Sequence, residues 1–189
     1  IGPDRRIGHA SPDARRLLDL IRKAGRPPFE ALSPADARTA YAASWEVMQS
    51  PGGEVASVED RQIPGPGGPL AIRIYRGLGT AAEAALPCLL FLHGGGWVIG
   101  DRDTHDVLCR QLCVASGCAV VSVDYRMGPE ARFPAAVDDC HAAVQWLRAH
   151  GDPLGLDTTR LALGGDSAGG NLAAVTALLM RNAGEAPAR

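Results

Sequence analysis

The chain has 189 residues, of which 46% are hydrophobic and 21% charged, and its formal net charge is −2. These values are typical of one globular domain with a hydrophobic core. A small negative charge gives no electrostatic reason to bind nucleic acid or an anionic membrane surface. No apolar run approaches the roughly 20 residues of a membrane-spanning helix. We therefore expect neither kind of partner.

Two short helices are expected first. Ser11-Pro12-Asp13 is typical of a helix N-terminus, and Gly25 follows the last apolar position of that helix. Ser33-Pro34 begins a second helix, which Ser50-Pro51-Gly52-Gly53 ends. From the residues alone, these helices could cover an edge of the fold or an entrance to a site.

A hairpin and then three buried strands are expected next. Val55 to Ile63 and Leu70 to Arg76 alternate in the manner of an antiparallel pair around a Pro- and Gly-rich turn. The continuous apolar runs Pro87–Leu92, Cys118–Asp124 and Arg160–Gly164 are typical of strands buried on both faces.

Helical patterns separate these runs. One has Val107, Leu108, Leu112 and Ala115 on its expected inner face and ends at Gly117, and the other begins at Pro134 and ends near His150-Gly151. Strands that alternate with such helices predict right-handed βαβ units on a largely parallel sheet.

Five cysteines lie in these apolar segments: Cys88, Cys109, Cys113, Cys118 and Cys140. An odd number in such positions favours buried free thiols in a reducing compartment, so we expect a cytoplasmic location. No group of Cys and His has the spacing of metal ligands. We expect no metal site and no cofactor.

The stretch Gly165-Asp166-Ser167-Ala168-Gly169 joins the last strand to a helical pattern. A strand that turns at once into a helix forces its corner residue into a strained conformation, and small neighbours are needed to avoid collisions. The corner would present the Ser167 hydroxyl at the positive end of a helix. A plain turn, or a phosphate-binding turn, is the alternative interpretation of this stretch alone.

A second glycine-rich stretch, His93-Gly94-Gly95-Gly96-Trp97, follows a buried strand. Consecutive glycines leave backbone N–H groups free to point at a ligand. An enzyme that transfers acyl groups needs such donors where negative charge develops on the carbonyl oxygen. The two stretches together are therefore more specific for acyl transfer than either one alone.

The two motifs resemble those of the hormone-sensitive-lipase-like carboxylesterases, the bacterial family IV branch of the α/β-hydrolases. A third motif, Tyr125-Arg126-Met127-Gly128-Pro129-Glu130, is similar to the Tyr-Arg-Leu-Ala-Pro-Glu of that family, from which Met127 and Gly128 depart. The resemblance extends from about Pro12 to about Arg181. It implies an α/β-hydrolase fold, with a mostly parallel sheet flanked by helices and an N-terminal helical cap over residues 1–54.

The resemblance also implies roles for single residues. Ser167 is the expected nucleophile, and the N–H groups of Gly95, Gly96 and Ala168 form the expected oxyanion hole. The residues expected to support the loop or pocket are His93, Gly94, Trp97 and Asp166. Tyr125, Arg126 and Glu130 are expected to form a polar brace below the site.

The family places an acid and then a histidine after the nucleophile. The 22 residues after Ser167 contain neither Asp nor His, and their only acid, Glu185, lies near an end that we expect to fray. We expect the triad acid and base to be absent from this chain, and His105 to be a poor candidate for the base. Residues 55–189 would then be a partial α/β-hydrolase core, with the C-terminal third of the fold absent.

The expected function is hydrolysis of short-to-medium acyl esters through an acyl-enzyme, with this chain as an incomplete and nearly inactive portion. The expected partners are a small-molecule ester, and either the C-terminal remainder of the protein or a second copy at the open sheet edge. The alternative is a catalytically inactive α/β-hydrolase-like module that binds a ligand or self-associates.

Overall fold

The structure is a computed structural model that describes residues 10–25, 27–49, 51–80, 85–186 and 188. Internal contacts divide the chain into two compact units, and the division falls between Ala37 and Arg38. This position lies inside helix α2 (Pro34–Met48), whereas the predicted cap ended at residue 54.

The first unit holds the helix predicted at the N-terminus, α1 (Pro12–Lys23), and a 3-10 turn, η2 (Phe29–Ala31). Ser11 is the N-cap of α1, and its side chain accepts a hydrogen bond from the Ala14 N–H at 3.3 Å. Ser33 caps the start of α2 in the same way, through the Asp36 N–H at 3.1 Å. Both predicted helix starts are confirmed, because in each case a serine oxygen binds an N–H that the helix leaves unpaired.

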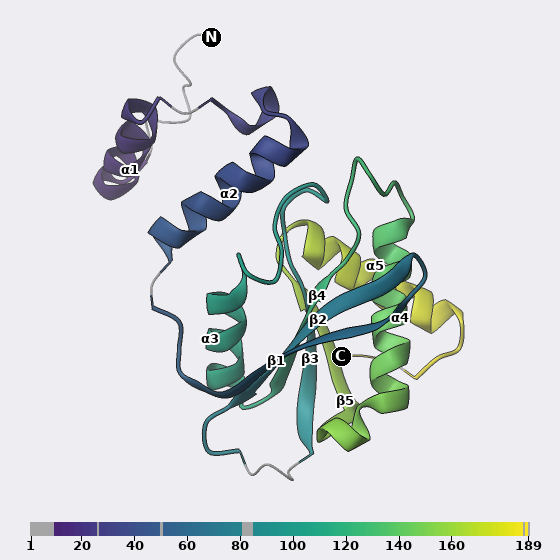
Figure 1. Ribbon diagram of the computed structural model, residues 1–189. Coiled ribbons are helices and arrows are strands. Elements are labelled where there is room, and N and C mark those ends of the chain that lie inside the picture. The colour runs from purple at the N-terminus through teal and green to yellow at the C-terminus, as the bar shows by residue number, and fades with distance from the viewer. Residues whose placement is uncertain (1–9, 26, 50, 81–84, 187, 189) are drawn as a thin grey trace. The chain divides into compact units, whose positions relative to one another are not determined.

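A five-stranded sheet forms the centre of the second unit (Figure 1). Its strands are β1 (Val55–Gly65), β2 (Gly68–Gly77), β3 (Leu86–Leu92), β4 (Ala119–Asp124) and β5 (Leu156–Gly165), in the spatial order β1-β2-β4-β3-β5. β3 pairs in parallel with both β4 and β5, while β2 runs antiparallel to β1 and to β4. The parallel centre and the antiparallel hairpin are as predicted, and together they make a mixed sheet.

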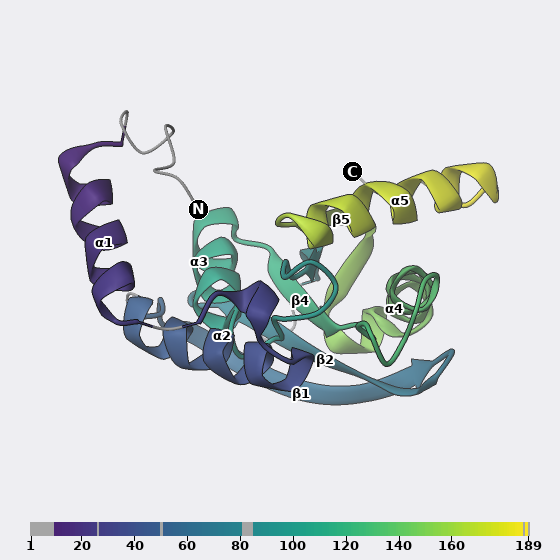
Figure 2. The same cartoon turned by 90° about the horizontal axis from the view of Figure 1, so that it is seen from above.

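Three helices cover the two faces of this sheet (Figures 1 and 2). α4 (Ala135–His150) and α5 (Ala168–Asn182) pack against one face, through buried side chains such as Val144, Leu147 and Leu172. α3 (Asp106–Ser116) packs against the other, and a 3-10 turn, η3 (Asp152–Leu154), precedes β5. No helix within the described ranges is both long and apolar enough to cross a membrane.

The buried face of α3 differs from the predicted one. Cys109 and Cys113, one helical turn apart, are fully buried against Phe91, whereas Ala115 is exposed. Leu108 and Leu112 pack against the same cluster, as predicted. The prediction was wrong for Ala115, which lies two residues after Cys113 and so points about 200° away from it around the helix. All five thiols are free; Cys118 is only partly buried, and the other four are buried as expected.

The strand register brings the two predicted motifs to one edge of the sheet. Leu92, the last residue of β3, pairs with Gly165, the last residue of β5, and with Val123 of β4. Because parallel strands point the same way, the segments that follow them leave from the same edge. The glycine-rich stretch, the third motif and the serine turn therefore emerge side by side.

Candidate active site

Ser167 occupies a sharp turn between β5 and α5. Its backbone has φ 51° and ψ −115°, a region that residues with a side chain rarely adopt, and the residue is exposed. A Cβ atom on Gly169 would collide with the carbonyl oxygen of Leu92. The turn has this shape because the start of α5 packs directly on the end of β3, where only glycine fits.

The segment Gly94–Trp97, called the glycine loop below, folds back on itself after β3. The N–H groups of Val98 and Ile99 both donate to the Gly95 carbonyl, at 3.1 and 3.0 Å. Gly95 has φ 128°, and a Cβ atom there would overlap the carbonyl of Ile99, so this fold requires glycine. Across the described ranges, the N–H groups of Gly95, Gly96 and Ala168 donate to no protein acceptor.

A hydrogen bond joins the glycine loop to the serine turn. The Gly94 N–H donates to Oδ1 of Asp166 at 2.8 Å, although the two residues are 72 positions apart in the sequence. The side chain of Asp166 is half exposed. Asp166, which directly precedes Ser167, therefore contacts the main chain of the glycine loop.

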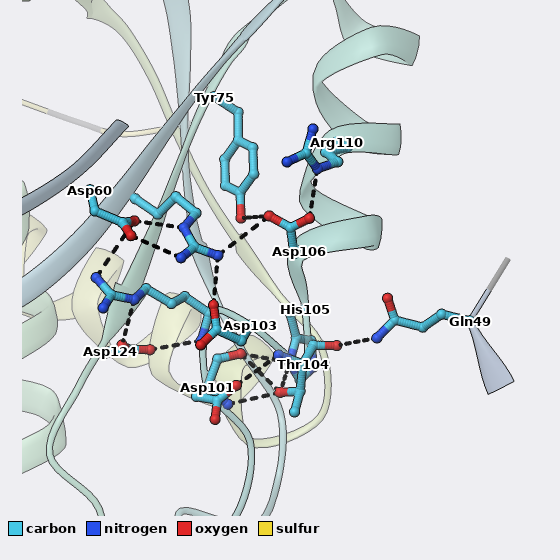
Figure 3. A network of polar contacts seen from close by, with 12 residues as sticks. Gln49, Asp60, Tyr75, Asp101, Asp103, Thr104, His105, Asp106, Arg110 and Asp124 are labelled. Carbon is cyan, nitrogen blue, oxygen red and sulfur yellow. Dashed lines mark hydrogen bonds and ion pairs between the residues drawn. The ribbon is translucent and has the colours of Figure 1, made fainter. Parts of the chain in front are cut away.

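His105 lies beside this bond. Its Nε2 is 3.4 Å from the same Oδ1 of Asp166, and its side chain is 2% exposed. Its Nδ1 lies 3.1 Å from the Thr104 hydroxyl and 3.2 Å from the Asp101 carbonyl, as Figure 3 shows. Because both ring nitrogens face other groups, His105 is poorly placed to accept a proton from Ser167.

His93 is buried directly below the glycine loop. Its Nδ1 is 2.8 Å from the Gly94 carbonyl, and its ring stacks on Tyr125 at 4.4 Å. Tyr125 donates its hydroxyl proton to the His93 carbonyl at 2.6 Å. Burial lowers the pKa of His93 to about 4, which keeps the ring neutral near pH 7. A neutral, immobilised imidazole supports the loop better than it would transfer protons.

Arg38 of α2 joins the glycine loop to the third motif, a contact that was not predicted. Its guanidinium donates to the carbonyls of Val98 and Gly128, each at 2.8 Å, and to Glu130 at 2.7 Å. The Gly128 N–H in turn donates to the Trp97 carbonyl at 2.7 Å. These partners lie 60 to 92 residues from Arg38, so no local pattern could have identified the contact.

The remaining residues of the third motif and the glycine loop have different surroundings. Arg126 forms an ion pair with the buried Asp139 of α4, at 2.8 Å. Met127 packs against the main core. Trp97 is 41% exposed and, with Phe133, lines an apolar pocket of about 420 Å³.

A polar network holds the segment that follows the glycine loop (Figure 3). Arg73 of β2 contacts Asp60 at 2.6 Å, Asp103 at 2.8 Å and Asp106 at 3.4 Å. Asp124, at the end of β4, accepts from the Arg102 N–H at 2.7 Å. Burial raises the pKa of Asp124 to about 6, although Arg102 opposes the change. The network fixes residues 101–106, and with them His105.

A second pair of acid and histidine lies elsewhere. Glu185 and His141 Nε2 are 2.9 Å apart, and Gln145 and Arg148 also bind this carboxylate. Glu185 was expected near a frayed end, but side chains of α4 hold it. It follows the C-terminal end of α5, whose 15 residues separate it from Ser167 by roughly 22 Å. This pair cannot serve Ser167.

Comparison with known proteins identifies the family of this chain. The profile of the family described as "alpha/beta hydrolase fold" matches residues 89–189. Esterase LipI of Mycobacterium tuberculosis is 48% identical over 130 residues, which are 69% of this chain and 41% of that protein. Ethyl acetate hydrolase of Pseudomonas putida is 38% identical over 172 residues, which are 88% of this chain and 54% of that protein.

A solved structure, that of ester-hydrolase EH1AB1 from the metagenome of Lake Arreo, superposes with a TM-score of 0.90 at 44% identity. The match covers 94% of this chain and 57% of that one, so the chain spans about half the length of these relatives. The chain belongs to the α/β-hydrolase family, in its hormone-sensitive-lipase-like carboxylesterase branch.

Proposed function

We propose that this chain is the nucleophile-bearing part of a serine carboxylesterase that hydrolyses short-to-medium acyl esters. One observation carries the proposal. The bond from the Gly94 N–H to Asp166 holds a loop with unpaired amides against the turn that exposes Ser167. An exposed hydroxyl beside fixed backbone donors is the arrangement that acyl transfer requires.

In the proposed reaction, the Ser167 oxygen attacks the ester carbonyl carbon, and the carbonyl oxygen becomes an oxyanion. The N–H groups of Gly95, Gly96 and Ala168 donate to that oxygen, each contributing about 10²–10³ in rate. As the intermediate collapses, the C–O bond to the leaving group breaks, the general base passes the former Ser167 proton to that oxygen, and the alcohol departs, which leaves an acyl-serine. Water then attacks the acyl carbon, which releases the carboxylic acid and restores Ser167.

A serine hydroxyl needs a general base to reach useful rates. No Asp or His follows Ser167 in these 189 residues, and His93 and His105 are held by other groups. We propose that the base and its acid come from a segment outside this chain. The isolated chain should then turn over p-nitrophenyl butyrate about 10⁶-fold more slowly than an enzyme with the complete triad. Rapid turnover by the purified chain would contradict this.

Covalent labelling tests the assignment of the nucleophile. A fluorophosphonate should modify Ser167 in the full-length gene product, and the Ser167→Ala variant should remain unmodified. Peptide mass spectrometry locates the adduct, and an adduct on any other residue would refute the proposal. Saturable ligand binding that survives Ser167→Ala, with no labelling at all, would instead favour the inactive binding module.

The open side of β5 suggests where the missing segment binds. Within the described residues β5 pairs only with β3, so its outer edge is free to pair with another strand. Leu178 and Leu179 of the neighbouring helix are 48% and 41% exposed. We propose that the C-terminal remainder covers this side, and that a second copy does so in the isolated chain. A stable monomer in light scattering, without binding of a hydrophobic dye, would contradict the proposal.

The free thiols bear on location. All five cysteines are unpaired, which supports the proposal of a reducing, cytoplasmic environment. A disulfide between any two of them in protein isolated from its own cells would contradict this.

A further inference from the structure

The carboxylate of Asp166 is shared between a main-chain donor and a buried imidazole. Oδ1 lies 2.8 Å from the Gly94 nitrogen and 3.4 Å from His105 Nε2. Since the side chain of Asp166 is 47% exposed, burial does not fix its position. The position of the carboxylate must therefore be fixed by the groups that contact its oxygens.

The His105 ring has little freedom to turn. Its centroid lies 5.6 Å from that of Trp45, 6.1 Å from that of Phe91 and 5.5 Å from that of His93. Its Nδ1 side is occupied by the carbonyl of Asp101 and the hydroxyl of Thr104. The direction in which Nε2 points is therefore set by packing around the whole ring.

The neighbours of His105 place an acceptor oxygen at each ring nitrogen. A carboxylate oxygen only accepts hydrogen bonds, so the contact with Asp166 is favourable when Nε2 carries the proton. Nδ1 can then accept from the Thr104 hydroxyl or, in the charged ring, donate to the Asp101 carbonyl. The tautomer protonated only on Nδ1 would turn the bare Nε2 towards the Asp166 carboxylate, just as the tautomer protonated only on Nε2 turns the bare Nδ1 towards the Asp101 carbonyl.

We propose that His105 is a positioning residue for the oxyanion loop. The polar contact of its Nε2 with Oδ1, at 3.4 Å, holds the Asp166 carboxylate in the orientation that binds the Gly94 N–H, and this fixes the amides of Gly95 and Gly96 that follow. His105 touches neither the ester nor Ser167 in this role. The catalytic consequence rests on the proposed esterase function, whereas the contact itself does not.

Hydrogen exchange in the 189-residue chain tests the contact without any hydrolysis. His105→Leu removes the donor at similar volume, and His105→Gln keeps an N–H donor at similar reach. The Gly94 amide should exchange about tenfold faster in the Leu variant and stay within about threefold of the parent in the Gln variant. If the Gly94 amide exchanges at the same rate in the two variants, or at the parent's rate in both, the proposal is overturned.

A second measurement covers the case in which His105→Leu fails to fold. Long-range ¹H–¹⁵N spectra of the parent chain should show His105 protonated on Nε2 between pH 6 and 8. A proton on Nδ1 alone would overturn the proposal whatever the variants do.

The full-length gene product tests the catalytic consequence. His105→Leu should lower kcat about tenfold with KM unchanged, and His105→Gln should restore it. If Ser167 resists labelling while the exchange and tautomer results hold, the esterase proposal fails and the positioning contact stands. If Ser167 is labelled but Gly94 exchange does not respond, the positioning proposal alone fails.

Discussion

Two pairs of carboxylate and imidazole lie at opposite ends of α5, and they differ in what else the carboxylate binds. At the N-terminal end, Asp166 also accepts from the main chain of the glycine loop. At the C-terminal end, the partners of the Glu185 carboxylate among the described residues are side chains of α4. An acid beside a histidine is thus weak evidence for catalysis. The link from the acid to the backbone around a nucleophile is the stronger sign.

The largest effect on kcat/KM is expected from substitution of Asp166, and it should be absent for Glu185. In a protein that includes the proposed C-terminal remainder, Asp166→Ala should lower kcat/KM of the proposed esterase reaction about 10²-fold, because the glycine loop loses its hydrogen bond to the serine turn. Glu185→Ala is the matched control and should change kcat/KM less than about twofold. Steady-state kinetics with a p-nitrophenyl ester measures both. Equal losses in the two variants would remove the distinction drawn between the two ends.

The buried His93, near the Ser167 end of α5, makes the stability of the protein depend on pH. Its folded-state pKa of about 4 lies below the ordinary value of 6.5, so the unfolded chain takes up the proton first. The contribution of His93 to the free energy of unfolding is therefore fully present above pH 6.5. It decreases by about 3 kcal/mol as the pH falls to 4. Asp124, with its pKa raised to about 6, acts in the opposite direction as the pH falls.

Urea unfolding at a series of pH values isolates the His93 effect when the parent is compared with His93→Gln. The stability advantage of the parent should shrink between pH 6.5 and pH 4. A constant difference across this range would show that His93 is not buried in its neutral form.

Because of backbone strain, substitutions at the two ends of α5 should change the free energy of unfolding in opposite directions. Ser167 has φ 51°, and Ser167→Gly should raise the free energy of unfolding by about 1 kcal/mol while abolishing labelling. Gly184, beyond the other end of α5, has φ 70°, so Gly184→Ala should lower it by about 1 kcal/mol. Chemical denaturation measures both changes. Destabilisation by Ser167→Gly would contradict the strain argument.

The smallest expected effect concerns the pair at the far end. Partial burial acts to raise the pKa of Glu185, but hydrogen bonds from His141 and Gln145 outweigh it and lower the pKa. A lowered pKa means stability that is present above pH 4.5 and is lost as the pH falls through the folded value. Glu185→Gln should cost about 0.5 kcal/mol at pH 7 and less at pH 3. An equal cost at both pH values would contradict the ionic contribution.

Local patterns predicted much of this molecule. The helix caps at Ser11 and Ser33, the hairpin and the three parallel strands follow from periodicity and turn residues, which act over a few positions. The contacts that Arg38 and His105 make could not be predicted in this way. They join segments far apart in sequence, and only the strand register brings their partners together. The inner face of α3 was predicted too widely, since Ala115 was placed on it with Leu108 and Leu112 but is exposed.

The hydrogen bonds of Arg38 to three partners have a consequence for engineering this protein. A guanidinium presents several donors in one rigid plane, which a lysine ammonium does not reproduce. A shortened version that starts at the first strand would leave two carbonyls and a carboxylate without their donor. The smallest transplantable unit should therefore begin before Arg38, within α2, rather than at β1.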